Sequence, residues 1–145
     1  MEKQEYKITI HAPAEKVWNT LWDDETYQLW TAPFSEGSRA ETDWKKGSKV
    51  LFVNEKGEGM VASIAENIPN KYLSIEHLGI IKDGVEDRDS EKVKAWAGAH
   101  ENYTLKNVDG HTELTVEMDI TDEYKDMFAE VWPKALDKLK ELAED

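Results

Sequence analysis

The chain has 145 residues, with 31 acidic and 18 basic side chains, a formal net charge of −13 and no cysteine. That length fits one domain spanning residues 1–145, which can bury roughly 70% of the surface that its unfolded chain exposes. The lack of cysteine excludes disulfides, thiolate nucleophiles and cysteine-ligated metal centres. The acidic surplus argues against a nucleic-acid partner, because phosphate binding requires clustered Lys and Arg.

Hydropathy gives no sign of a targeting or membrane segment. Residues 1–6 lack the apolar stretch of a signal peptide. The longest aliphatic and aromatic run, residues 50–53, is about four residues long, whereas a membrane span needs about 18. We therefore expect a cytoplasmic protein that does not insert into membranes. We also expect a monomer, although the sequence does not give the oligomeric state.

The N-terminal third predicts one strand and two short helices. Tyr6, Ile8 and Ile10 alternate with polar residues, which is typical of a half-buried strand. Pro13 is suited to the start of a helix, because a missing N–H costs nothing there. The apolar face of this helix comprises Ala14, Val17, Trp18, Leu21 and Trp22. A second short helix follows the capping residues Asp23 and Asp24 and ends before Pro33.

The middle of the chain, from residue 35 to residue 120, has the turn spacing of an antiparallel sheet. Asp109-Gly110 is the clearest hairpin signal, because alternating apolar residues flank it on both sides. Strands are predicted near 37–44, 48–55, 58–68, 71–81, 99–107 and 111–120, which with the first strand makes about seven.

The C-terminal segment predicts one long helix capped by Thr121 or Asp122. Its apolar residues recur every three or four positions over about five turns, so the helix must lie along an apolar surface. Pro133 removes the hydrogen bond to the carbonyl of Ala129, which predicts either a kink or an unwound first half.

This order of elements, together with four sequence stretches, resembles the START-like, Bet v 1-like superfamily, in the branch similar to the C-terminal domain of the activator of the Hsp90 ATPase. The matching stretches are 8–18, 30–33, 43–47 and 131–136. The resemblance implies an α+β helix-grip fold, in which a curved antiparallel sheet and a long C-terminal helix enclose an apolar cavity. The superfamily includes lipid and hormone binders, polyketide cyclases and co-chaperone domains, so fold alone does not select the function.

From this resemblance we expect a module that binds a small apolar or amphipathic molecule without a cofactor. The candidate lining residues are bulky or adaptable side chains on predicted inward faces, with one polar pair. They are Trp18, Trp30, Trp44, Phe52, Met60, Ile75, His77, Trp96, Glu101, Tyr103, Met118, Met127, Phe128 and Val131. Such side chains equally suit plain core packing, and that alternative stays open for each of them.

The polar pair is His77 with Glu101, each of which shares a strand face with apolar residues. If the two strands are adjacent, a register that places Ile75 opposite Tyr103 places His77 opposite Glu101. The pair would then orient a ligand hydroxyl or carbonyl, or serve as acid and base. The alternative is a strand end in solvent beside the long connection 82–98.

That connection is charge-rich until Ala95-Trp96-Ala97. It is either a lip over the cavity mouth with Trp96 as an apolar latch, or a solvated hairpin extension whose Trp96 packs on the nearest apolar surface.

Two other functional classes remain open. A co-chaperone-type protein-interaction domain is implied by the Hsp90-activator branch, although the additional N-terminal domain of the full activator has no counterpart in these residues. A cyclase or hydrolase would need a catalytic group in the cavity, for which His77 and Glu101 are the candidates. The four histidines show no HxH or HExxH spacing, so no metal site is predicted.

Overall fold

A computed structural model describes residues 1–35 and 37–145. Along the chain the elements are β1 (Glu2–Ile10), α1 (Ala14–Trp22), α2 (Asp24–Thr31), β2 (Arg39–Glu41), β3 (Lys49–Val53), β4 (Gly59–Ile68), β5 (Tyr72–Lys82), β6 (Val85–Asp87), α3 (Glu91–Lys94), β7 (His100–Val108), β8 (His111–Ile120) and α4 (Asp122–Glu144). The predicted α+β class is confirmed, with two short helices after the first strand and one long helix at the end.

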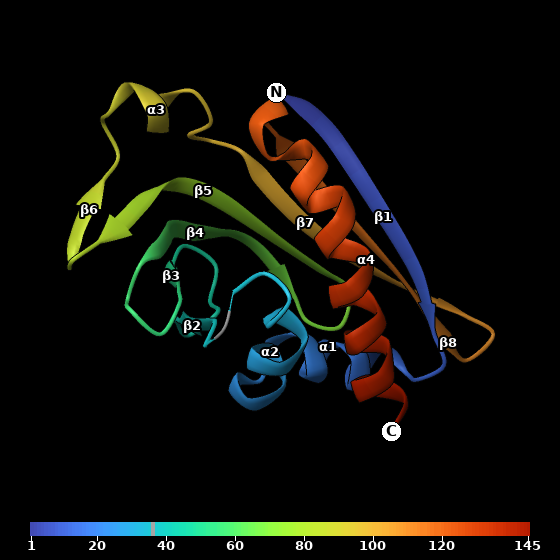
Figure 1. The fold of residues 1–145 in the computed structure, drawn as a ribbon. Coiled ribbons are helices and arrows are strands. Elements are labelled where there is room, and N and C mark those ends of the chain that lie inside the picture. Colours follow the sequence, from blue (N-terminus) through green and yellow to red (C-terminus); the bar gives the residue numbers. More distant parts are fainter. Residues whose placement is uncertain (36) are drawn as a thin grey trace.

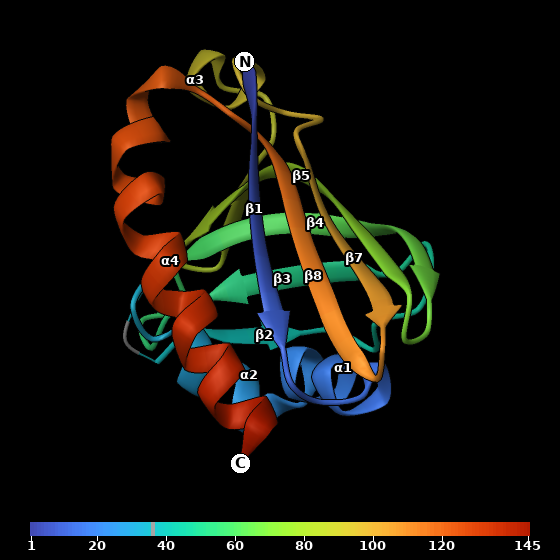
Figure 2. The same cartoon turned by 90° about the vertical axis from the view of Figure 1, so that its right-hand side faces the viewer.

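The strands form a single sheet of eight antiparallel strands. The order is β1-β8-β7-β5-β4-β3-β2, with β6 paired to β5 outside this path. The sheet curves around α4, while α1 and α2 lie together near the C-terminal end of that helix (Figure 1). Viewed from the side, α4 runs along the sheet in the neighbourhood of β1 (Figure 2). The predicted strand near 37–44 is reduced to the three residues of β2 at the sheet edge.

Strand alternation separates an inner face from an outer face. In β8 every second residue from Thr112 to Ile120 is buried, and the residues between them are partly exposed. The register pairs Ile8 with Leu114 and Tyr6 with Val116, so apolar side chains of β1 and β8 meet on the inner face. Among the described residues the main core lies between this face and the helices.

The predicted hairpin at Asp109-Gly110 is confirmed. Val108 pairs with His111 across a two-residue turn. Asp109 has a φ of 52° and Gly110 a φ of 85°, which is the left-handed backbone that a type I′ turn requires. Aspartate and glycine are among the residues that accept this conformation most readily, which is why this hairpin is readable from sequence.

Helix α4 is continuous over 23 residues and includes Pro133. Its first half is therefore helical, and the unwinding considered from the sequence does not occur. Its C-terminal half buries an apolar stripe made of Trp132, Ala135, Leu136, Leu139 and Ala143. In its N-terminal half Phe128 is only partly buried, and Met127 is 47% exposed.

The connection 82–98 folds back on β5. Ile81 pairs with Glu86, and Ser90 caps the short helix α3 by accepting a hydrogen bond from the Val93 amide. A side chain at Gly79 would place its Cβ 2.2 Å from the carbonyl oxygen of Asp87, so glycine is required where β6 returns. The segment thus extends the hairpin of β5 and β6, and Trp96 is half-buried near its end.

Candidate functional site

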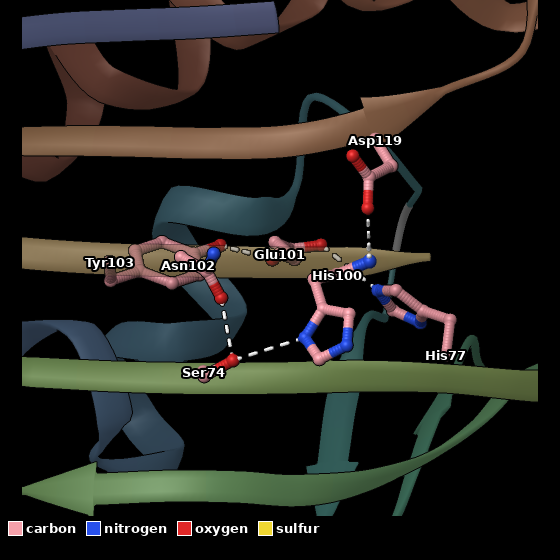
Figure 3. A network of polar contacts seen from close by, with 7 residues as sticks. All are labelled: Ser74, His77, His100, Glu101, Asn102, Tyr103 and Asp119. Carbon is pink, nitrogen blue, oxygen red and sulfur yellow. Dashed lines mark hydrogen bonds and ion pairs between the residues drawn. The ribbon is translucent and has the colours of Figure 1, made fainter. Parts of the chain in front are cut away.

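His77 on β5 and Glu101 on β7 lie side by side on the inner face of the sheet. The His77 Nε2 atom is 3.2 Å from the Glu101 Oε1 atom. Their side chains are 15% and 22% exposed, so both are shielded but still reached by solvent. Figure 3 shows the two side chains approaching one another across the gap between their strands. The sequence-based pairing of these two residues therefore exists in the structure.

The sequence left the register of these strands open, and the observed one differs by two residues from the register that would place Ile75 opposite Tyr103. Ile75 pairs with Glu101, and Leu73 pairs with Tyr103. His77 exchanges backbone hydrogen bonds with Ala99 and Gly98, and its side chain reaches Glu101 diagonally. A shift of two residues preserves strand parity, which is why the pair survives the change of register.

An irregularity in β5 lies directly beside His77. On β4, Ala62 pairs with His77 and Val61 pairs with Gly79, so Leu78 is an extra residue in β5. A bulge of this kind bends its strand and changes the direction of the neighbouring side chains. The bulge therefore contributes to the direction in which the His77 side chain points at this end of the sheet.

Glu101 also accepts a hydrogen bond from the Tyr103 hydroxyl group. Burial raises the pKa of Tyr103 well above its ordinary value, and the nearby charge of Glu101 raises it further. The pKa of Tyr27, on α2, is also raised, first by burial and then by Glu101. The two phenols therefore stay neutral at physiological pH, and Tyr103 is a hydrogen-bond donor to the carboxylate.

Aromatic rings surround this polar group on its inner side. The Phe52 ring centroid lies 6.0 Å from that of His77, and the Trp22 centroid lies 4.8 Å from that of Tyr103. The ring contacts continue through Tyr27 and Trp30 to Trp132 on α4. Edge-to-face and tilted arrangements dominate, as expected for rings that carry quadrupoles.

Most of the candidate lining residues come together in this cluster. Trp30, Ile75, Tyr103 and Met118 are buried in the core, and Trp18, Trp44, Phe52 and Phe128 pack partly buried against it. Met60 on β4 is half-buried opposite Phe52. The remaining candidates lie nearer the surface: Val131 and Trp96 are half-buried, and Met127 is exposed.

Three residues that the sequence reasoning left out of the candidate site belong to this ring cluster: Trp22, Tyr27 and Trp132. Trp22 shares a helix face with the candidate Trp18, and Trp132 shares one with the candidate Phe128. Helical periodicity could therefore have identified both as members of the cluster. The indole nitrogens of Trp22 and Trp132 and the Nδ1 atom of His77 are buried and have no hydrogen-bond partner among the described residues. Leaving a buried polar atom unpaired is costly, so these three atoms mark where a polar ligand atom would be favoured.

Two hollows on the described surface are lined mostly by polar and charged residues, and neither is lined by a tryptophan, tyrosine or phenylalanine ring of this cluster. One has a volume of about 300 Å³ and is lined by Ser35, Asn54, Glu55, Lys56 and Glu58. The other is about 10 Å³, close to the size of one water, and is lined by Lys3, His100, Asn102, Glu117, Met118 and Asp119. Between the sheet and α4, aromatic side chains occupy the space expected for an apolar cavity.

A second polar network lies on the opposite face of the same strands (Figure 3). The buried Ser74 hydroxyl donates to Asn102 Oδ1 at 2.6 Å and lies 3.3 Å from His100 Nδ1. The His100 Nε2 atom is 3.6 Å from Glu76, too far for a hydrogen bond. In this arrangement the Ser74 proton points to the Asn102 amide oxygen and not to the His100 ring.

This architecture is that of the helix-grip class: a curved antiparallel sheet, two short helices after β1 and a long C-terminal helix. Residues 11–144 match the family described as Activator of Hsp90 ATPase homolog 1-like protein, AHSA1. The chain belongs to this family, and the predicted resemblance is confirmed. Comparison with curated proteins gives no match.

Solved structures of similar fold span the whole chain. The solution structure of the Aha1 dimer from Colwellia psychrerythraea is 21% identical with a TM-score of 0.73, covering 99% of this chain and 97% of that one. Protein MLL2253 from Mesorhizobium loti is 18% identical with a TM-score of 0.72, covering 97% and 96%. Protein CV1439 from Chromobacterium violaceum is 17% identical with a TM-score of 0.70, covering 99% and 97%. At these identities the similarity shows the fold alone.

Among the described residues, no helix combines the length and the apolar character needed to span a membrane.

Proposed function

We propose that this domain binds a small amphipathic molecule at the His77–Glu101 end of the inner face. The observation that carries the proposal is a polar pair, reachable from solvent, that lies at the border of an aromatic cluster. His77 and Glu101 would hold the polar end of the ligand, and its apolar part would lie among the neighbouring rings. The unpaired Nδ1 atom of His77 supports this assignment, because a ligand atom would satisfy it.

Binding requires the aromatic side chains near the pair to move. Phe52 and Trp44 are only partly buried, and Met60 is a half-buried neighbour with several rotatable bonds. Rotation of these side chains is less costly than opening the fully packed centre around Trp30. Burying apolar ligand surface contributes about 25 cal/mol per Å², which offsets the cost of reordering the rings.

The test is a backbone-amide NMR titration with a panel of fatty acids, sterols, flavonoids and aromatic acids. We expect saturable shifts centred on His77, Glu101 and Tyr103 for at least one class. Glu101→Gln should weaken that binding about tenfold or more, because a hydrogen bond to a charged group contributes about 1.5–3 kcal/mol. Glu117→Gln, the same change on the outer face of β8, should leave the affinity unchanged.

Absence of saturable shifts across the panel would contradict the proposal. Equal loss of affinity in both variants would contradict the role given to Glu101.

A second candidate is a co-chaperone-type interaction with Hsp90, which the family match favours. It is tested by measuring Hsp90 ATPase activity with and without the purified chain, together with a pull-down. Stimulation accompanied by capture would support this function, and neither effect would be expected from a domain that only binds small molecules.

A further inference from the structure

Two histidines that are 100 positions apart in sequence meet at the end of the β1–β8 ladder. The Nδ1 atom of His11 lies 3.2 Å from the Nδ1 atom of His111, and their ring centroids are 4.3 Å apart. The ladder ends with Ile10 opposite Thr112, so these histidines occupy the next opposed position. Both side chains are exposed.

We propose that His11 and His111 together bind a divalent transition-metal ion such as Zn²⁺, Ni²⁺ or Cu²⁺. The nitrogen separation carries the proposal. Two imidazole nitrogens at about 2.0–2.1 Å from one tetrahedral zinc ion lie about 3.3 Å from each other. The distance between these two Nδ1 atoms agrees with that value and is also that of a hydrogen bond between the rings. An ion would replace this hydrogen bond, and each ring would turn so that its Nδ1 lone pair faces the ion.

Hydrogen bonds fix the backbone that carries the two histidines. The His11 amide donates to Glu144 Oε2 at 2.8 Å, which ties this turn to the end of α4. The Thr112 hydroxyl donates to the Ala12 carbonyl oxygen at 2.7 Å, which joins the residues next to each histidine. Ligands held by such contacts lose less conformational entropy on binding than mobile ones.

The site has two protein ligands. The described residues contain no group of three or more histidine, cysteine, aspartate or glutamate side chains arranged for a metal. Glu144, the nearby carboxylate, is already engaged by the Lys140 ammonium group and the His11 amide. Water therefore completes the coordination sphere. Imidazole ligands select Zn²⁺, Ni²⁺ and Cu²⁺ over Mg²⁺ and Ca²⁺, which prefer oxygen.

Metal binding would also link two segments that are far apart in the sequence. One ion would join the turn after β1 to the start of β8. Because the unfolded chain does not hold these histidines together, binding favours the folded state and raises the melting temperature with metal concentration.

The test is isothermal titration of tag-free protein with ZnCl₂ and with NiCl₂. We expect one metal per chain, and a loss of affinity of about tenfold or more in His11→Asn and in His111→Asn, equivalent to about 1.4 kcal/mol or more. His100→Asn is the matched control, since His100 is a partly exposed histidine on the outer face without a second histidine beside it, and it should bind as the unmodified chain does.

A direct readout keeps the test valid if a variant folds poorly. In the unmodified protein, Cu²⁺ should broaden the NMR signals of His11 and His111 before those of His77 and His100. Affinity unchanged in both variants, broadening centred elsewhere, or no binding at millimolar metal would overturn the proposal. None of these results depends on the ligand proposed for the inner face.

Discussion

Glu101 has two partners on the inner face of the sheet. One of its carboxylate oxygens faces His77 and the other accepts from Tyr103. Its charge also acts on Tyr27, which belongs to a different element. A single carboxylate therefore contacts two side chains and acts on a third that belongs to another element.

The Glu101→Gln variant should lower the pKa of the Tyr103 phenol. The amide keeps the shape of the side chain but removes the negative charge that opposes ionisation. Burial is the larger cause of the raised pKa, so the value should fall and still remain above the ordinary value of 10.0. Ultraviolet titration of the phenols measures this.

Glu117→Gln is the control, because Glu117 lies on the outer face and should leave the phenol titration unchanged. An unaltered Tyr103 pKa in Glu101→Gln would show that the carboxylate does not act on this phenol.

At the scale of elements, the two halves of α4 differ in how deeply their apolar side chains are buried. Leu139 in the C-terminal half is fully buried, whereas Met127 in the N-terminal half is 47% exposed. The amphipathic pattern read from the sequence extends over both halves, because periodicity records which residues share a face but not what covers that face.

Leu139→Ala should lower the free energy of unfolding by about 2–5 kcal/mol, because it leaves a cavity in the packed core. Met127→Ala on the same helix should cost under about 1 kcal/mol, because its side chain is already half in solvent. Urea unfolding followed by circular dichroism measures both. Equal costs for the two variants would mean that the N-terminal half of α4 is packed as tightly as the C-terminal half.

The positions of the strands could be predicted from the sequence, but their pairing could not. The positions of β4, β5, β7 and β8 were predicted closely because each has a run of alternating residues bounded by turn signals. The register of β5 against β7 could not be fixed from the sequence, because strand parity is visible there and absolute alignment is not. The observed register differs by two residues from the one considered. The extra residue Leu78 was also missed, since a bulge leaves the composition of a strand unchanged.

At the scale of the whole molecule, the buried phenols link stability to pH. Tyr27 and Tyr103 have raised pKa values in the folded state, so folding favours their neutral forms. Their contribution is fully present below the ordinary phenol pKa of 10.0 and is lost as the pH rises above it, because the unfolded chain then ionises.

The free energy of unfolding should therefore fall above pH 10 by about 1.4 kcal/mol per pH unit for each buried phenol. Tyr103→Phe removes one of the two buried phenols. It should therefore halve the contribution of these phenols to the dependence of the unfolding free energy on pH. Urea unfolding at a series of alkaline pH values measures the slope. Tyr72→Phe, a substitution of a partly exposed tyrosine on β5, is the control for the loss of a hydroxyl group outside the core.

The sequence by itself determined the α+β class, the type and order of most elements, the Asp109-Gly110 hairpin and the shared face of His77 and Glu101. These features depend on local periodicity and turn chemistry, which each short segment carries alone. Only the tertiary structure decided the strand register, the position of Tyr27 within reach of the Glu101 charge, the ring-filled space beneath α4 and the meeting of His11 with His111. Those features depend on distances between segments that are far apart in the chain. Such distances are fixed only when all the strands have paired and the sheet has packed against the helices.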